Sequence, residues 1–515
     1  MVMTKNDSSI EKYIYPTGLA LLALLVFKYI FNPQIDINGD NCYYYAFASA
    51  LAAGEGYVDV AGEPSALFPP GYPLLMTPLR FITDSVVAQK VMNLLFLFGA
   101  VMLLYFSLLA VEVKRFISFV ACAAVLVTPH LLEFSTMMMS EASCVLFIAL
   151  SLWAYLRVCS VMQGTKALPW RSLWLWVFLF SVAYAFLIRT QAVVLFVAFF
   201  AALLVVRRFK LAALLVVVFA TCWSPWALRN AALELGQSRY VSQIDFSNIW
   251  GNLKMLVVQA IPESVIPFVS VQYKTQPSLL LYVLAVSMFI VVIYGFLKLK
   301  NLRVVLPLLL LGNIAIVSIM NTPSSYRYMI IVLPFITAGL VVGLWNLISL
   351  VATRLLKRSI GSWVMLLLFV PLLFTASDKS KHTIFGLHKN AADGYPITLK
   401  NFIAMGDAVA KYPDAKIVAS RKPELLYVHS GVRGKRLKEE KTNVAILNHM
   451  LDENIDYLVL ENMGFKYTYD VLYPFVQQHG EFFELLKYTN QPTSILLKFK
   501  KKEAAQWLKS NGHRW

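Results

Sequence analysis

Long runs of apolar residues, separated by short polar segments, fill the first three quarters of the chain. A helix needs roughly 20 apolar residues to cross the hydrocarbon core of a bilayer, and on this criterion the pattern predicts about eleven membrane spans. Their expected positions are 16–32, 86–110, 116–135, 140–156, 173–188, 190–206, 211–227, 278–297, 304–320, 329–350 and 360–376. The expected fold is therefore a mainly α, polytopic membrane protein.

The pattern changes from Asp378 onward, where the apolar runs become too short to cross a membrane. "AKIVAS" and "IDYLVL" are typical of short buried strands, and "PELLYVHSG" of a helix that ends at Gly431. "FFELLKYTNQPTSILLKFK" predicts a hairpin with its turn at "NQP". We therefore expect a transmembrane domain over 1–377 and a small soluble α/β domain over 378–515.

Composition supports the membrane assignment, since 58% of the residues are hydrophobic and only 15% are charged. The net charge of +17 is concentrated in short basic clusters in every second loop, which indicates membrane topology and not nucleic-acid binding. With these clusters in the cytoplasm, the N-terminus is cytoplasmic. The first loop (33–85) and the C-terminal domain then face outward.

The first outer loop contains the most unusual polar residues. "NGDNCYYYAFASALAAGEGY" predicts a short interfacial helix that ends at Gly54 and Gly56, with Asp40 at its N-terminal edge. Asp40 is either only a helix cap or a carboxylate placed at the lipid interface to accept a proton. The following "EPSALFPPGYPLLMTPL" holds so many prolines that we expect no regular helix there, and its stiffness suits a substrate-cavity wall that includes Tyr72.

Charged residues also occur at the outer ends of several spans. Glu133 and Glu141 lie at the connection before the fourth span. Each is either a residue at a span end that extends into water or a functional group of the site. Arg189 and Arg327 stand on the face where the positive-inside rule disfavours arginine. A guanidinium can hold a phosphate by two hydrogen bonds, whereas the alternative role is anchoring to lipid headgroups. The five cysteines show no spacing typical of a metal site.

Together these motifs resemble those of the GT-C glycosyltransferases. The shared features are an acid ahead of "YYYAFASALAAGEGY", then "FPPGYPLL", an "SE" that opens the fourth span, a mid-chain arginine and a late "YRYMIIVLPF". Their order is most similar to the ArnT-like, protein-O-mannosyltransferase-like branch (glycosyltransferase family 39 and its bacterial relatives). The resemblance covers roughly residues 10–376.

The resemblance implies an enzyme that moves a sugar from a polyprenyl-phosphate-linked donor to a lipid, glycan or protein acceptor at the outer face. Asp40 would be the catalytic base and Arg327 would bind the donor phosphate. Arg189, Tyr328, Glu141 and Tyr72 would complete the substrate site. Many members have two adjacent acids in the first loop, whereas this chain has Asp40 followed by Asn41. That departure favours a single carboxylate without a metal ligand set, and it leaves dependence on a divalent metal open.

The resemblance also implies a bacterial inner-membrane location, with the C-terminal domain in the periplasm. Two other functions remain open at this point. A transporter or flippase for lipid-linked sugars would show internal repeats and charges near the membrane midplane, and we find neither pattern in the sequence. A non-enzymatic scaffold would explain the tail, but not the outward Asp40, Arg189 and Arg327.

Overall fold

The structure is a computed structural model of the chain. It describes residues 11–36, 39–162, 168–235, 243–266, 276–321, 326–355 and 392–515, with the isolated positions 269, 357, 364, 386 and 388–390. Its contacts group the chain into two compact units. The membrane unit comprises Met1–Pro33, Ala66–Tyr72 and Ser85–Ala392. The second unit, called the outer unit after the side of the membrane predicted for it, comprises Gln34–Ser65, Pro73–Asp84 and Asp393–Trp515.

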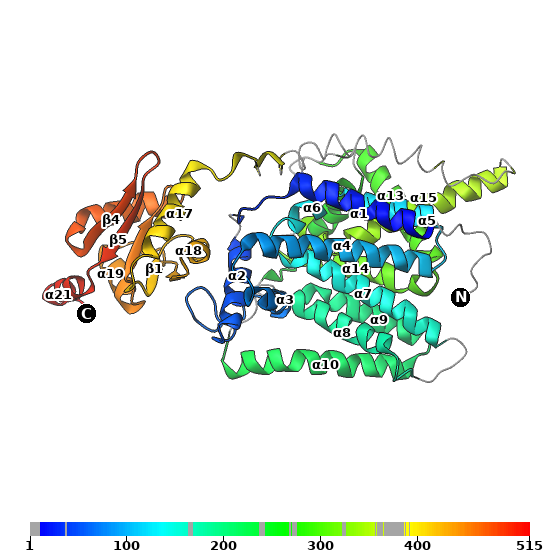
Figure 1. The fold of residues 1–515 in the computed structure, drawn as a ribbon, viewed down its shortest axis with the longest axis horizontal. Helices are drawn as coiled ribbons and strands as arrows, with labels where there is room; N and C mark the ends of the chain where they lie inside the picture. Colours follow the sequence, from blue (N-terminus) through cyan, green and yellow to red (C-terminus); the bar gives the residue numbers. More distant parts are fainter. Residues whose placement is uncertain are drawn as a thin grey trace. The chain divides into compact units, whose positions relative to one another are not determined.

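Helices make up the membrane unit (Figure 1). Seven of its described helical segments are long and apolar enough to cross a membrane. They are α1 (Glu11–Ile30), α4 (Val86–Ala110), α7 (Ser140–Val161), α10 (Phe209–Ala232), α13 (Leu279–Lys298), η4 with α14 (Lys300–Ser318), and α15 (Leu333–Leu355). The protein is therefore an integral membrane protein, as the apolar runs predicted.

The remaining predicted spans have a different form. α5 (Arg115–Leu126) and α6 (Pro129–Ser135) are bent by 62° at their junction, where Pro129 lacks the N–H that would continue the helix. α8 (Leu173–Ile188) and the segment of η1 (Thr190–Ala192) with α9 (Val193–Val205) are apolar but shorter. The run predicted at 360–376 lies outside the described residues apart from Val364.

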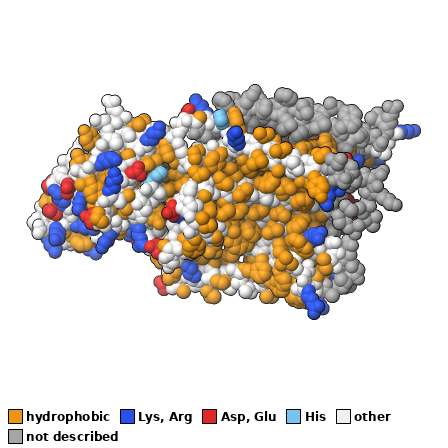
Figure 2. Space-filling model, in the orientation of Figure 1, with side chains coloured by type: hydrophobic (Ala, Val, Ile, Leu, Met, Phe, Trp, Pro, Cys, Tyr) orange, Lys and Arg blue, Asp and Glu red, His pale blue; other side chains and the backbone are white. Residues whose placement is uncertain are grey.

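Apolar side chains serve the membrane unit in two ways. Tyr155, Phe178 and Phe199 join α7, α8 and α9 inside the unit, with ring centroids 4.8–5.4 Å apart. Other large apolar side chains are exposed, such as Leu25 at 69% and Leu279 at 80%, as expected for a surface in contact with lipid. Figure 2 shows this apolar covering over the transmembrane helices.

The connection before α13 contains three further short helices. They are α11 (Ile249–Met255), η3 (Leu256–Ala260) and α12 (Ile261–Val265).

The C-terminal part of the outer unit is a five-stranded mixed sheet in the order β2-β1-β3-β5-β4. The strands are β1 (Ile417–Ala419), β2 (Arg433–Lys435), β3 (Tyr457–Leu460), β4 (Phe483–Thr489) and β5 (Ser494–Phe499), and β2, β1 and β3 are parallel. The helices are α17 (Ile397–Val409), α18 (Pro423–Ser430), α19 (Asn443–Asp452), α20 (Tyr473–Gln478) and α21 (Lys501–Ser510), with the short η6 (Thr468–Leu472) and η7 (Gly480–Phe482). The predicted α/β fold, the hairpin and the helix end at Gly431 are confirmed.

Parts of the first outer loop belong to this same unit. α2 (Gly39–Ala52) is the short helix predicted in this loop, and it packs against α18. The chain after it bonds to β2, since Gly434 donates to the carbonyl of Val60 at 2.9 Å. Contacts therefore group this loop with the C-terminal sheet. The domain boundary predicted at residue 377 stays a prediction, because that residue lies outside the described ones.

The expectation of no regular helix in the proline-rich segment was wrong for its second half. α3 spans Gly71–Arg80 and contains both Pro73 and Pro78. Pro73 lies in the first turn, where the helix needs no N–H from the residue. Pro78 lies near the end, so only one backbone hydrogen bond is lost within a short helix.

Candidate active site

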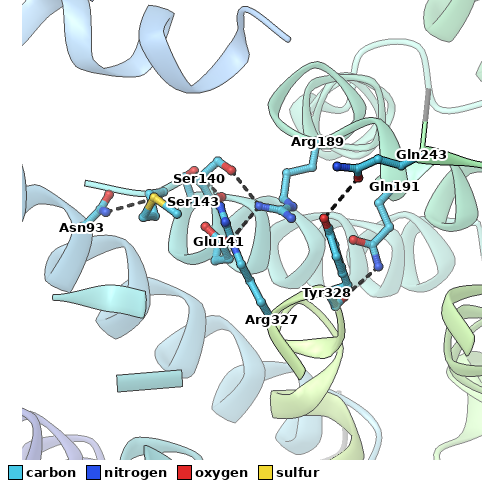
Figure 3. Close-up of polar contacts among 10 residues, drawn as sticks. Asn93, Ser140, Glu141, Ser143, Arg189, Gln191, Gln243, Arg327 and Tyr328 are labelled. Atoms are coloured by element: carbon cyan, nitrogen blue, oxygen red, sulfur yellow. Dashed lines mark hydrogen bonds and ion pairs between the residues drawn. The ribbon is translucent and has the colours of Figure 1, made fainter. Parts of the chain in front are cut away.

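A buried carboxylate binds two arginines in the membrane unit. The Oε1 atom of Glu141 lies 2.8 Å from an Nη1 nitrogen of Arg189 and 2.7 Å from the Nε nitrogen of Arg327. Side-chain exposure is 1% for Glu141, 2% for Arg189 and 19% for Arg327. Figure 3 shows the two guanidinium groups converging on this carboxylate from different elements. We call these three residues the arginine–glutamate cluster.

Local backbone structure brings the three residues together. Glu141 is in the first turn of α7. Arg189 follows the last residue of α8 in an extended conformation (φ −145°, ψ 122°), at the predicted break between two apolar helices. Arg327 is in the 3-10 turn η5 (Tyr326–Met329), which precedes α15. Each residue therefore lies at the end of an apolar segment, where a charged side chain is least costly to place.

Neighbouring groups hold the arginines in position. Arg189 also donates to the hydroxyl of Ser140 at 3.0 Å. The Nη2 atom of Arg327 lies 4.0 Å from the sulfur of Met139, and its guanidinium lies 5.6 Å from the ring centre of Phe134. Residues on both sides of the α6–α7 connection therefore contact the two arginines of the cluster.

Tyr72 is linked through Asn93 to the backbone that precedes Glu141. Its buried hydroxyl donates to the side-chain oxygen of Asn93 at 3.0 Å. Asn93 in turn donates to the carbonyls of Met137 and Met139, the latter at 3.0 Å. Tyr72 therefore supports the connection that precedes Glu141.

Tyr328 belongs to a second network of polar side chains. Its hydroxyl donates to Gln243 at 3.3 Å, and its carbonyl accepts from Gln191 at 2.7 Å. Gln191 also donates to Asn313 at 2.8 Å. Figure 3 shows Gln191 and Gln243 around Tyr328, and the bond to Asn313 extends this network to α14.

Asp40 lies in the outer unit, in the first turn of α2, and its exposure is 8%. Burial, followed by the charge of Glu424, raises the pKa of the neighbouring Cys42 thiol. The same two causes raise the pKa of Tyr43 to about 12. Asp40 therefore stands in a low-dielectric setting beside a buried acid from the C-terminal part of the chain.

Sequence reasoning missed several polar residues in the membrane unit. Lys90 and Asn93 on α4 are completely buried, as is Asn313 on α14. The signal was present for Lys90, because an ionisable residue inside an apolar span is a functional candidate by itself. For the amides no such signal exists, since their partners are far away in the sequence.

The cluster carries a net charge of +1 when Glu141 is ionised, since two guanidinium groups face one carboxylate. Such a site attracts an anion, and arginine suits phosphate because its planar donors match the phosphate oxygens. Among the residues that the structure describes, no three His, Cys, Asp or Glu side chains gather in a way that could hold a metal ion.

The fold is that of a polytopic integral membrane protein, and comparison with solved structures shows that it has the GT-C architecture. ArnT from Cupriavidus metallidurans, bound to undecaprenyl phosphate, superimposes with a TM-score of 0.63 at 11% identity, over 94% of this chain and 97% of that one. The apo state of ArnT gives a TM-score of 0.61 at 12% identity, with 95% and 98% covered.

A third similar structure is the archaeal oligosaccharyltransferase AglB from Archaeoglobus fulgidus, in complex with an inhibitory peptide and a dolichol-phosphate. Its TM-score is 0.56 at 12% identity, over 88% of this chain and 70% of that one. No family model and no curated protein matches the sequence. The predicted GT-C fold is thus confirmed, and the similarity extends through the C-terminal region of ArnT.

Proposed function

We propose that this protein is a glycosyltransferase that moves a sugar from a polyprenyl-phosphate-linked donor to an acceptor at the outer face of the membrane. The observation that carries the proposal is the arginine–glutamate cluster, within a fold shared with proteins bound to undecaprenyl phosphate and dolichol-phosphate. The N-terminus would be cytoplasmic and the C-terminal sheet periplasmic.

Arg327 and Arg189 would bind the donor phosphate. Arg327 is the more exposed of the two and therefore the more accessible to a ligand. Glu141 would keep both guanidinium groups oriented while leaving the excess positive charge that an anion needs. Tyr328 and Tyr72 would contribute by holding the turn of Arg327 and the connection before Glu141.

Asp40 would act as the general base that takes the proton from the acceptor hydroxyl. The acceptor oxygen would attack the anomeric carbon from the face opposite the phosphate, so the configuration would invert. The bond to polyprenyl phosphate would break with its electron pair on the phosphate oxygen. Arginines that stabilise this charge remove the need for a general acid.

The direct test is transfer of radiolabelled sugar from a panel of polyprenyl-phosphate sugars by the purified protein in nanodiscs. Wild-type protein should release polyprenyl phosphate, and Asp40→Asn should lower the rate at least 100-fold because general-base catalysis typically contributes that much. Parallel reactions with EDTA decide whether a divalent metal takes part. Labelled lipid that crosses the bilayer without turnover would instead support a transporter.

The phosphate assignment has its own test in donor binding. Arg327→Ala should weaken binding of a polyprenyl-phosphate sugar by about tenfold, or roughly 1.4 kcal/mol, because one charge-assisted contact is lost. Arg229→Ala is the matched control, since Arg229 is an arginine of α10 whose guanidinium lies over Trp226. Equal donor affinity in the two variants would reject the phosphate role of Arg327.

A further inference from the structure

A second buried acid lies against the helix of Asp40. Glu424 is in the first turn of α18, and its exposure is 1%. Its Oε1 atom occupies the space beside Gly39, so that a methyl group on Gly39 would lie only 2.8 Å from it. Gly39 is the first residue of α2 and directly precedes Asp40. The carboxylate of Glu424 is therefore positioned at the N-terminus of the helix that carries Asp40.

Two cations lie near the carboxylate of Glu424. Its Oε1 atom lies 3.7 Å from the ammonium of Lys422 and 3.6 Å from the guanidinium of Arg436. Among the described residues, its buried Oε2 atom has no hydrogen-bond partner. A buried acid without a full set of partners destabilises a fold, so its presence beside α2 calls for a functional explanation.

Further contacts keep this part of the C-terminal sheet next to the outer loop. Arg433 lies 3.3 Å from Glu55, and Lys435 lies 2.5 Å from Glu63. On the other side of α2, the guanidinium of Arg80 lies 4.2 Å from the ring centre of Tyr45. Because α2 is held from two sides, a charge on α18 keeps a constant position relative to Asp40.

We propose that Glu424 is a positioning residue for Asp40, which it holds in place by fixing the N-terminus of α2. The proposal rests on the function proposed above. An anion at a helix N-terminus is favourable, which anchors the first turn of α2.

The first experiment compares hydrogen exchange of the α2 amides in the full-length protein in nanodiscs. Glu424→Gln should speed exchange in the first turn of α2 about tenfold, and Gly39→Ala should do the same by displacing the carboxylate without removing a charge. Glu63→Gln is the matched control, because it removes another glutamate that pairs with the C-terminal sheet. Unchanged exchange in both test variants would overturn the anchoring role, whether or not the protein transfers sugar.

The second experiment measures kcat and the KM for the donor. Glu424→Gln should lower kcat three- to tenfold and leave the KM within twofold, because the proposed base is displaced while the proposed phosphate contacts are unchanged. Glu424→Asp should restore kcat, and Glu63→Gln should leave both constants within twofold. A folded Glu424→Gln protein with unchanged kcat would overturn the positioning role.

Wild-type protein that transfers no sugar would reject the proposed function, and the exchange experiment would then decide the anchoring of α2 by itself.

Discussion

At the residue scale, the central feature is that one carboxylate serves two arginines. Glu141 and Arg189 are both nearly excluded from solvent, so neither charge is stable there without the other. The side chain of Arg327 is partly exposed and remains in contact with solvent. The difference in burial makes Arg327 the more solvent-exposed arginine of the cluster.

Glu141→Gln tests this reading through stability. The variant leaves the buried guanidinium of Arg189 without its carboxylate, so we expect a loss of about 3 kcal/mol in the free energy of unfolding. Thermal unfolding in detergent measures the effect. Glu133→Gln is the control, because the side chain of Glu133 is 25% exposed and its removal leaves no fully buried charge unpaired. Its Oε2 atom lies 3.8 Å from the Nδ1 atom of His130. Equal stability of the two variants would contradict the pairing.

At the element scale, small residues allow α13 and α15 to approach closely. A methyl group on Gly295 would lie 2.0 Å from the carbonyl oxygen of Gly339, and one on Gly343 would lie 2.1 Å from that of Val291. Gly339 and Gly343 form a GxxxG pattern on α15, which is typical of tight helix contacts in membranes. Backbone atoms cannot move aside as a side chain can, so these contacts require glycine.

Gly343→Ala should therefore force the two helices apart and lower the stability of the membrane unit by about 2 kcal/mol, as overpacking of a close contact does. The measurement is again thermal unfolding in detergent. Gly99→Ala is the matched control in α4, because its methyl group would meet only the side chain of Leu146, at 3.1 Å. A larger effect at Gly99 than at Gly343 would argue against the close approach.

At the scale of the whole molecule, segments far apart in the sequence form one compact unit. Residues 34–65 and 73–84 group with residues 393–515, although three hundred residues of membrane helices separate them in the chain. The C-terminal sheet is therefore more than an appended domain, because it supplies contacts to the loop that carries Asp40.

The predicted orientation has a test at this scale. In a background with Cys159 and Cys222 changed to alanine, the other three cysteines are buried. A membrane-impermeant maleimide should label Ser510→Cys in intact spheroplasts, because the positive-inside rule places the C-terminal region outside. Lys210→Cys, in the first turn of α10 and next to the basic Arg207 and Arg208, should react only after lysis. The reverse pattern would place Asp40 on the cytoplasmic side and reject the outer-face assignment.

The sequence by itself determined the elements whose signals are local. Apolar runs of span length predicted the membrane helices, and the strands, the hairpin and the end of α18 at Gly431 followed from pattern and turn residues. The order of short motifs predicted the GT-C fold. The sequence did not predict α3, because the many prolines of this segment argue against a helix. A helix tolerates proline in its first turn, which is where Pro73 lies.

Only the tertiary structure decided which distant residues meet. The pairing of Glu141 with Arg189 and Arg327 joins the start of one span to two separate turns, and no spacing in the chain encodes it. The contact of Glu424 with Gly39 likewise links positions almost four hundred residues apart. Local patterns decide whether a segment is a helix or a strand, whereas a charge pair in a buried site depends on how the finished elements pack.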